Sequence, residues 1–237
     1  MRIYLVTDEG LLLGKDLYRT VEAAVKGGVS MVQLREKESS TREFIERAIR
    51  LKEVLTPYGV PLIINDRVDV ALAANADGVH VGQSDMEAGD VRAKIGPDKI
   101  LGVSAHTVEQ AKLAEAQGAD YLGVGAVFPT GSKDDADEVP HDTLRAICDA
   151  VNIPVIAIGG ITEENTPELS GSGICGIAVI SAIFGQKDIE QATEFLQKWQ
   201  RVITARLTES DKALAAESRI LREKEFIQLK KDRVIIH

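Results

Sequence analysis

A five-residue segment at positions 129–133, Pro-Thr-Gly-Ser-Lys, directly follows an apolar run at 121–128. The segment brings two hydroxyls, a glycine and an ammonium to the end of an expected strand. Short donors and a cation beside accessible backbone are suited to binding phosphate oxygens. Gly-Ser-Lys turns also occur as simple solvated turns, so this segment alone leaves both interpretations open.

A second polar segment follows the apolar run 31–34, where Gln33, Arg35 and Lys37 alternate with Leu34 and Glu36. Alternate side chains of an extended segment share a face, so the first three are expected to point toward one side. One amide and two cations on one face suit a clamp for a polyanion or a heterocycle. A solvated loop held by salt bridges to neighbouring glutamates is the alternative.

Two carboxylates, Asp66 and Asp85, follow the apolar runs 60–64 and 78–81. If these runs are neighbouring parallel strands, both carboxylates lie at one face and repel each other unless a cation lies between them. Oxygen-only ligands favour Mg²⁺, which keeps waters and takes further ligands from substrate phosphates. Alternatively, each aspartate caps the helix that follows it.

The last two expected strands end in Gly159-Gly160 and in Ser181. In barrels of alternating strands and helices, the corresponding loops often bind phosphate through backbone N–H groups. The glycines would let a ligand approach the backbone closely, although they could also simply form a turn.

Three further polar residues lie along the expected strands. His80 is mid-strand and is either a hydrogen-bonded core histidine or a catalytic base, whereas Ser104 faces inward and His106 lies nearer the rim. No spacing supports a Ser–His–Asp or Cys–His arrangement, so covalent nucleophilic catalysis is disfavoured.

The elements that must position these side chains alternate regularly. Short apolar runs rich in β-branched residues are typical of parallel strands buried on both faces. The expected strands are 3–6, 31–34, 60–64, 78–81, 100–103, 121–127, 154–158 and 177–180. The expected helices are 17–27, 41–55, 69–74, 90–95, 108–117, 141–151, 166–170 and 189–204. This α/β pattern predicts a (β/α)8 TIM barrel over residues 1–206, with an open doubly wound sheet as the alternative.

Residues 207–237 differ in composition from the rest, because mixed charges alternate there with a narrow apolar stripe. The stripe predicts an extra charged C-terminal helix that packs on the barrel or on a second subunit in a homo-oligomer. A partly disordered tail is the other interpretation.

The overall composition narrows the class of protein. A chain of 237 residues with 44% hydrophobic residues is typical of an ordinary soluble globular protein, and its net charge of −9 disfavours nucleic-acid or anionic-membrane partners. No apolar stretch approaches the roughly 18 residues of a membrane span, and the first apolar run is too short for a signal peptide, so we expect neither. Cys148 and Cys175 are expected to be free thiols. We therefore expect a cytoplasmic protein.

Six segments, in this order, resemble the thiamine phosphate synthase family. They are Gln33-Leu34-Arg35-Glu36-Lys37, Asn65-Asp66-Arg67, Gly78-Val79-His80-Val81-Gly82-Gln83-Ser84-Asp85, Pro129-Thr130-Gly131-Ser132-Lys133, Ile158-Gly159-Gly160-Ile161 and Val179-Ile180-Ser181-Ala182-Ile183. The resemblance extends over about residues 4–201 and implies a TIM-barrel alkyl transferase of thiamine biosynthesis. Such an enzyme joins an aminopyrimidine carrying a hydroxymethyl diphosphate to a thiazole phosphate, or to its carboxylated form. Thiamine monophosphate and pyrophosphate are the products.

The resemblance also implies a role for each matched residue. Catalytic roles would fall to Arg35, Lys37, Ser104 and Lys133. The pyrimidine diphosphate would be held by Gln33, Leu34, Arg35, Glu36, Lys37, Asn65, Ser104 and Lys133. The thiazole phosphate would be held by Thr130, Gly131, Ser132, Gly160, Ile180 and Ser181. Asp66 and Asp85 would hold Mg²⁺.

The family is thought to react dissociatively through a pyrimidine cation, which agrees with the lack of a protein nucleophile. Ser132 stands where the family often has threonine, and the hydroxyl is kept. The nearest rival is the related thiazole tautomerase or regulator branch, which tends to lose the 33–37 clamp and the aspartate pair. An unrelated phosphate-binding barrel isomerase or aldolase is a further alternative.

Overall fold

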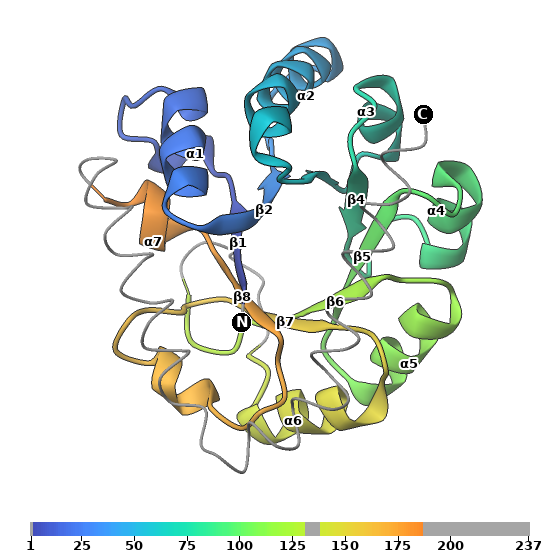
Figure 1. Cartoon of the computed structure of the whole chain (residues 1–237). Helices are drawn as coiled ribbons and strands as arrows, with labels where there is room; N and C mark the ends of the chain where they lie inside the picture. The colour runs from blue at the N-terminus through green and yellow to red at the C-terminus, as the bar shows by residue number, and fades with distance from the viewer. Residues whose placement is uncertain (1, 131–137, 187–237) are drawn as a thin grey trace.

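The computed structural model describes residues 2–130 and 138–186, and in them parallel strands close into a barrel (Figure 1). The strands follow one another in sequence order, and β8 pairs back with β1. Their bounds are β1 Arg2–Val6, β2 Val29–Leu34, β3 Leu62–Asn65, β4 Gly78–Val81, β5 Ile100–Ala105, β6 Tyr121–Val124, β7 Val155–Ile158 and β8 Gly176–Val179. The predicted (β/α)8 barrel is confirmed, and the open sheet is excluded because both edges are paired.

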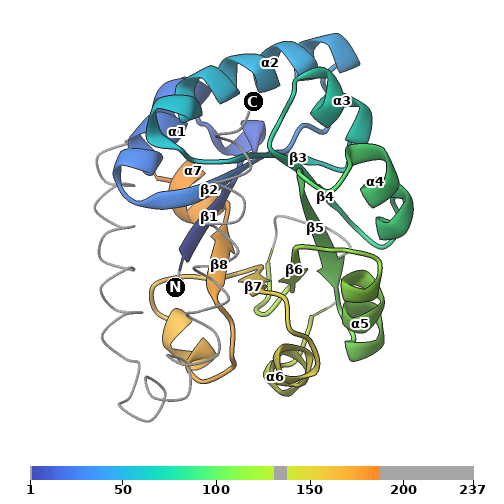
Figure 2. The same ribbon diagram turned by 45° about the vertical axis from the view of Figure 1, so that its right-hand side comes forward.

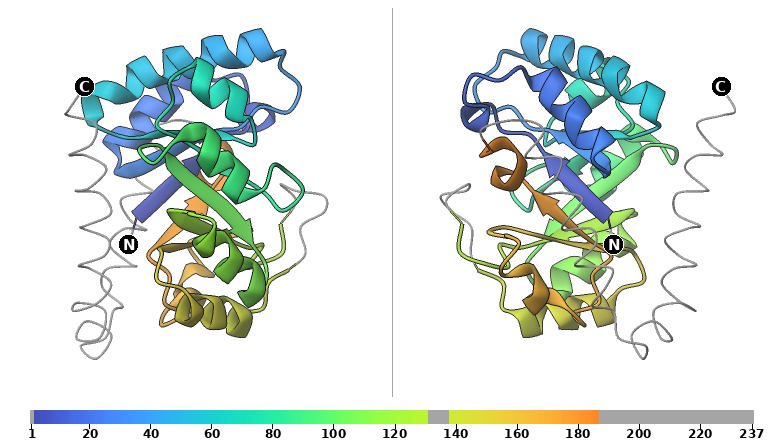
Figure 3. Two further views of the ribbon diagram at one scale, coloured as in Figure 1. Left: turned by 90° about the vertical axis from the view of Figure 1, so that its right-hand side faces the viewer. Right: turned by 60° about the vertical axis from the view of Figure 1, so that its left-hand side comes forward.

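The helices lie outside the strands, as the side views show (Figure 3). Each crossover carries the chain over the outer surface before the next parallel strand begins, as parallel pairing requires. The α-helices are α1 Leu17–Lys26, α2 Thr41–Leu55, α3 Val68–Ala73, α4 Ala88–Ile95, α5 Val108–Ala116, α6 His141–Ala150 and α7 Ser181–Phe184. Short 3-10 turns are η1 Glu9–Leu11, η2 Thr56–Tyr58 and η3 Thr166–Leu169.

Strand alternation divides the apolar residues into two layers. The outer layer lies between strands and helices and includes Leu5 and Ile64. The inner layer fills the barrel itself and consists of Tyr4, Val6, Ile63, Ile100, Tyr121, Ile156 and Ala178. Because the inner layer contains two tyrosines, the barrel interior is partly polar.

Local sequence signals define the ends of two helices. The Ser40 hydroxyl accepts from the backbone N–H of Glu43, while the Glu43 carboxylate accepts from the Ser40 backbone N–H at 2.9 Å. This reciprocal capping box fixes the start of α2. Gly27 is the C-cap of α1, which ends at Lys26, one residue short of the predicted helix end.

Most elements lie within two residues of their predicted bounds, and two differ more clearly. Strand β6 ends at Val124, but the chain continues alongside β7, because Val127 N donates to the Ile158 carbonyl at 3.0 Å. The expected helix at 166–170 is instead the 3-10 turn η3. Pro167 lies in its first turn and Gly171 has a φ of +77°, so the segment is too short to propagate an α-helix.

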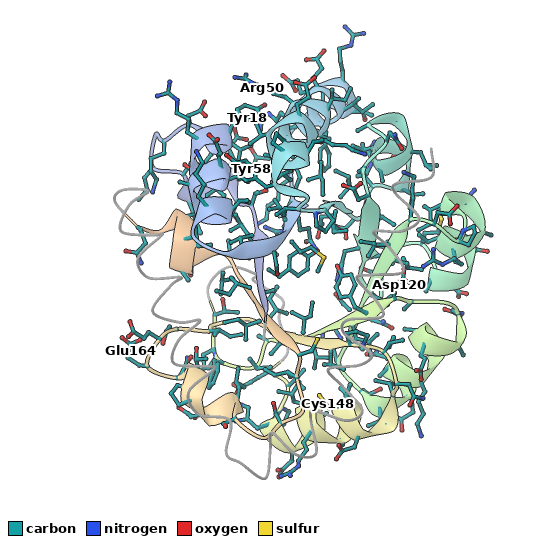
Figure 4. All side chains as sticks on the ribbon, in the orientation of Figure 1. Tyr18, Arg50, Tyr58, Asp120, Cys148 and Glu164 are labelled. Atoms are coloured by element: carbon teal, nitrogen blue, oxygen red, sulfur yellow. The ribbon has the colours of Figure 1, made fainter. Side chains whose placement is uncertain are left out.

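The expected helix at 189–204 and the charged extension at 207–237 lie outside the described residues. Within the described ranges, no helix combines the length and apolar character needed to span a membrane. Cys148 and Cys175 are free thiols, as predicted. On the outer surface, the Arg50 guanidinium lies 4.0 Å from the Tyr18 ring centroid and so links α2 to α1 (Figure 4).

Candidate active site

A continuous chain of hydrogen bonds crosses the interior of the barrel. Gln33 Nε2 donates to the Tyr4 hydroxyl at 2.8 Å, and the Tyr4 and Tyr121 hydroxyls are 2.8 Å apart. The Tyr121 hydroxyl lies 2.9 Å from His80 Nδ1, and His80 Nε2 lies 3.0 Å from Ser104 Oγ. All are buried except Ser104, which is half-buried. We call these five residues the inner chain; they come from β2, β1, β6, β4 and β5.

Two glycines leave room for the inner chain. A Cβ atom at Gly102 of β5 would lie 2.2 Å from Tyr121 Cζ and 2.4 Å from His80 Nδ1. A Cβ atom at Gly123 of β6 would lie 3.0 Å from His80 Cε1. The imidazole and the phenol therefore occupy space that other residues on these strands would fill.

Burial keeps the two tyrosines of the inner chain neutral. Desolvation raises the pKa of Tyr4 and of Tyr121 well above the usual range for a phenol, so both hydroxyls keep their protons. The two rings meet edge to face, with centroids 5.9 Å apart. His80 is thus a hydrogen-bonded interior histidine, in agreement with the first of the two interpretations of its sequence position.

The cation Arg35 lies at the rim just beyond β2 and is anchored to the segment after β1. Its backbone N–H donates to Thr7 Oγ1 at 3.0 Å, and its guanidinium pairs with Asp8 at 3.2 Å. Lys37 is exposed two residues farther along. One cation is therefore oriented by the protein, and the other lies in solvent.

Leu34 and Glu36 face away from the barrel interior, as strand alternation predicts. Leu34 is buried in the outer layer. The Glu36 side chain is only 3% exposed and accepts from Arg47 at 2.8 Å and from Ser39 at 2.6 Å. Both side chains therefore pack or bond outside the barrel interior. The expectation that these two residues bind substrate is thereby limited to their backbone groups.

The carboxylates Asp66 and Asp85 follow the adjacent strands β3 and β4. Asp66 has a left-handed φ of +62°, and its backbone N–H donates to the His80 carbonyl at 2.7 Å. Asn65 Nδ2 donates to the Asp66 carboxylate at 2.5 Å, while Gly82 N donates to the Asp85 carboxylate at 2.7 Å. These hydrogen bonds fix both carboxylates at the same end of the barrel.

The helix-capping interpretation of these aspartates is wrong. The N-cap of α3 is Arg67 and that of α4 is Glu87, and neither helix has a side-chain cap. Among the described residues, no group of three or more His, Cys, Asp and Glu side chains could hold a metal. Two carboxylates alone fit a Mg²⁺ ion that completes its shell with phosphate oxygens and water.

The end of β7 lies against the start of the 129–133 segment. Gly160 has a φ of +63°, and a Cβ atom there would lie 2.4 Å from the Pro129 carbonyl oxygen. Asn165 Nδ2 donates to the Gly160 carbonyl at 2.8 Å. The two segments predicted to bind phosphate therefore adjoin, and Gly160 is required by both backbone conformation and space.

The remaining predicted residues divide into described and undescribed positions. Thr130 is half-buried, and Ile180 packs against the inner layer just before Ser181, which opens α7. Gly131, Ser132 and Lys133 lie outside the described residues.

Sequence reasoning missed Tyr4 and Tyr121. Each is a hydroxyl-bearing residue at an inward position within an otherwise apolar strand, and that combination is the signal that could have found them. The inner chain ends at Gln33 and Ser104, two residues that the sequence did single out.

Similarity to known proteins agrees with this geometry. The thiamine monophosphate synthase family matches residues 3–183. A thiamine-phosphate synthase of Clostridium tetani is 55% identical over 82% of this chain and 93% of its own length, and one of Methanobrevibacter smithii is 54% identical over 84% and 94%.

A solved structure supports the same assignment. The thiamine phosphate pyrophosphorylase from Pyrococcus furiosus superposes with a TM-score of 0.77 at 42% identity, covering 85% of this chain and 96% of that one. The likeness thus extends over the whole described barrel (Figure 2), inner chain and rim included. The chain therefore belongs to the thiamine monophosphate synthase family of transferases.

Proposed function

We propose that this barrel transfers the pyrimidine methylene group of an aminopyrimidine diphosphate to the ring nitrogen of a thiazole phosphate. The products are thiamine monophosphate and pyrophosphate. The observation that carries the proposal is the meeting of two groups at one end of the barrel. These are the buried inner chain, which offers an amide and a hydroxyl, and a rim of paired carboxylates and cations.

The inner chain suits a flat, polar heterocycle. Gln33 and Ser104 are held in place by buried hydrogen bonds, so their remaining hydrogen-bonding groups are pre-organised for a ligand above them. Aliphatic side chains of the inner layer, such as Ile63 and Ile156, provide apolar contact below. Such a mixture of apolar walls and few polar groups is typical of small-molecule sites.

The rim suits the diphosphate. In the proposed reaction the bond between the methylene carbon and the diphosphate oxygen breaks, and its electron pair leaves with pyrophosphate. The thiazole nitrogen then supplies the pair that forms the new C–N bond, so no protein nucleophile and no proton transfer are needed. Arg35, Lys37 and Lys133 would neutralise the charge that develops on the leaving group.

The carboxylates Asp66 and Asp85 would hold Mg²⁺. When bound, the ion would supply charge neutralisation to the diphosphate oxygens. The protein's contribution is to hold both carboxylates by the Asn65 and Gly82 hydrogen bonds, so that their charges are fixed before a ligand arrives.

The thiazole phosphate would bind at the neighbouring side of the rim. Gly160 and Ser181 supply backbone N–H groups and a hydroxyl there, and Pro129 approaches Gly160 closely. Thr130, Gly131, Ser132 and Ile180 complete the proposed contacts. The partners in this proposal are thus two small phosphorylated molecules, in a cytoplasmic protein.

The test is an assay of the purified protein with Mg²⁺ and both substrates. We expect thiamine monophosphate and pyrophosphate to form in equal amounts. Absence of thiamine monophosphate at saturating substrate would contradict the proposal. Isomerisation of the carboxylated thiazole phosphate without consumption of the diphosphate would instead support the tautomerase alternative.

A further inference from the structure

Inside the barrel, the nitrogen of the Gln33 amide is hydrogen-bonded, whereas its oxygen is available to a ligand. The side chain is only 5% exposed, and its Nε2 donates to the Tyr4 hydroxyl. Within residues 2–130 and 138–186, no hydrogen bond to Gln33 Oε1 is present. A buried carbonyl oxygen without a donor is costly, so this atom is expected to accept from a ligand.

Given that Gln33 Nε2 donates to Tyr4, counting protons along the inner chain sets the direction of every other bond. Tyr4 accepts from Gln33, so its single O–H must donate to Tyr121. Tyr121 then has its own O–H available for His80 Nδ1, which must be the unprotonated ring nitrogen. The His80 proton is therefore on Nε2 and donates to Ser104 Oγ.

The two ends of the inner chain consequently present opposite groups. Gln33 turns an acceptor, Oε1, toward the ligand, and Ser104 keeps its own O–H as a donor. The opposite arrangement would require all five groups to reverse together, with the Gln33 amide turned over and the His80 proton moved to Nδ1. A neutral chain therefore has two states that differ at both ends at once.

We propose that Tyr4, Tyr121 and His80 are positioning residues that fix this hydrogen-bond polarity, and that the polarity selects an aminopyrimidine over its oxo counterpart. The exocyclic amine of the aminopyrimidine is a donor that matches the acceptor Gln33 Oε1. The unprotonated ring nitrogen of the aminopyrimidine is an acceptor. In the oxo counterpart the exocyclic oxygen is an acceptor and faces Oε1 unfavourably. This inference rests on the proposed function, because that function names the aminopyrimidine.

Gly102 and Gly123 provide independent support. Both leave space for the His80 and Tyr121 rings, so the strands are shaped around this pair. Burial that raises the pKa of both tyrosines keeps their hydroxyls protonated, as the proton count requires.

The first measurement uses the unaltered protein without substrate. Nitrogen-15 NMR of the histidine rings reports the tautomer, with the His80 signal assigned by its loss in His80→Gln. We expect His80 to carry its proton on Nε2. A proton on Nδ1, or a positively charged ring at pH 7.5, would overturn the proposal whether or not the protein is a synthase.

The second measurement compares two unreactive ligands, the aminopyrimidine alcohol and its oxo counterpart, by calorimetry. The unaltered protein should bind the amino form at least about tenfold more tightly. Tyr121→Phe keeps the ring but breaks the chain between Tyr4 and His80, and it should reduce this preference at least about fivefold. Tyr58→Phe is the matched control, because it removes a phenol bonded to Glu22 on the outer surface, and it should leave the preference unchanged.

The outcomes separate the inference from the proposed function. If Tyr121→Phe weakens both ligands equally and preserves the preference, the tyrosine is only structural and the inference is wrong. If the unaltered protein prefers the amino form yet makes no thiamine monophosphate, the proposed function fails while the polarity of the chain stands. If Tyr121→Phe does not fold, the tautomer of the unaltered protein decides.

Discussion

The inner chain and the rim are adjacent, yet they are built differently. Inside the barrel, polar groups from five strands are hydrogen-bonded to one another, and all but the half-buried Ser104 are buried. At the rim, the charged groups Asp66 and Lys37 are exposed, and Arg35 is paired with Asp8, which is not among the proposed ligand-binding residues. The polar groups of the inner chain are thus hydrogen-bonded to one another except at its two ends, Gln33 and Ser104. The rim instead holds charges that a diphosphate could use.

This difference indicates a division of labour. A buried network is pre-organised and can discriminate between ligands by hydrogen-bond pattern. Exposed charges discriminate little by shape but can neutralise a leaving group. In this account the interior determines which heterocycle binds, and the rim determines how fast the bond breaks.

The largest expected effect comes from removing one rim charge. Asp66→Asn should reduce kcat at least about 100-fold, because it halves the carboxylate charge available to Mg²⁺. Asparagine tolerates the left-handed φ of +62° at this position, so the backbone should be retained. Asp90→Asn, at an exposed position of α4, is the control and should keep kcat within about twofold. A normal rate for Asp66→Asn would disprove the metal assignment.

The next effect tests the interior. Gly102→Ala should destabilise the barrel by about 1–3 kcal/mol, measured by urea unfolding, because its Cβ would lie 2.2 Å from Tyr121 Cζ. Gly89→Ala in α4 is the matched control, since its nearest neighbour is 3.7 Å away and alanine favours helix. That control should be neutral or stabilising. Equal stability of both variants would show that the inner chain is not closely packed.

Much of the difference between the side chains that face the barrel interior and those that face the helices could be predicted from the sequence. Strand alternation correctly separated Gln33 and Arg35 from Leu34 and Glu36, because a period of two is fixed by backbone geometry. Register across the barrel is not local: the Tyr4–Tyr121 contact joins residues 117 positions apart. Only closure of the barrel brings them together, so neither tyrosine was recognised.

Rim details were also hard to predict. Both aspartates precede helices and so resemble caps in the sequence. The actual N-caps, Arg67 and Glu87, lack side-chain capping bonds and follow no common capping preference.

A smaller effect is expected from the residue that orients Arg35. Asp8→Asn keeps an acceptor for the Gly10 N–H but removes the ion pair, which should raise KM for the diphosphate substrate about threefold. Asp16→Asn changes the same charge at the N-cap of α1 and should not change KM. A lower KM in Asp8→Asn would mean that Asp8 competes with the substrate rather than positioning Arg35.

The smallest effect concerns stability at the outer rim. Hydrogen bonding from Arg67 lowers the pKa of Asp69 below its ordinary value of 3.8. A lowered pKa gives stability that is present above the unfolded value and lost as the pH falls through the folded one. The pair is exposed, so Asp69→Asn should cost at most about 0.5 kcal/mol at pH 7 and nothing near pH 2. A larger cost at pH 2 than at pH 7 would reverse the predicted sign.

The most direct test of the division between interior and rim is calorimetry of two ligands with and without Mg²⁺. Pyrophosphate should bind only when Mg²⁺ is present, and Asp66→Asn should abolish that binding. The aminopyrimidine alcohol should bind equally with or without Mg²⁺, and equally to Asp66→Asn. Pyrophosphate binding that is independent of Mg²⁺, or alcohol binding that requires it, would contradict the account.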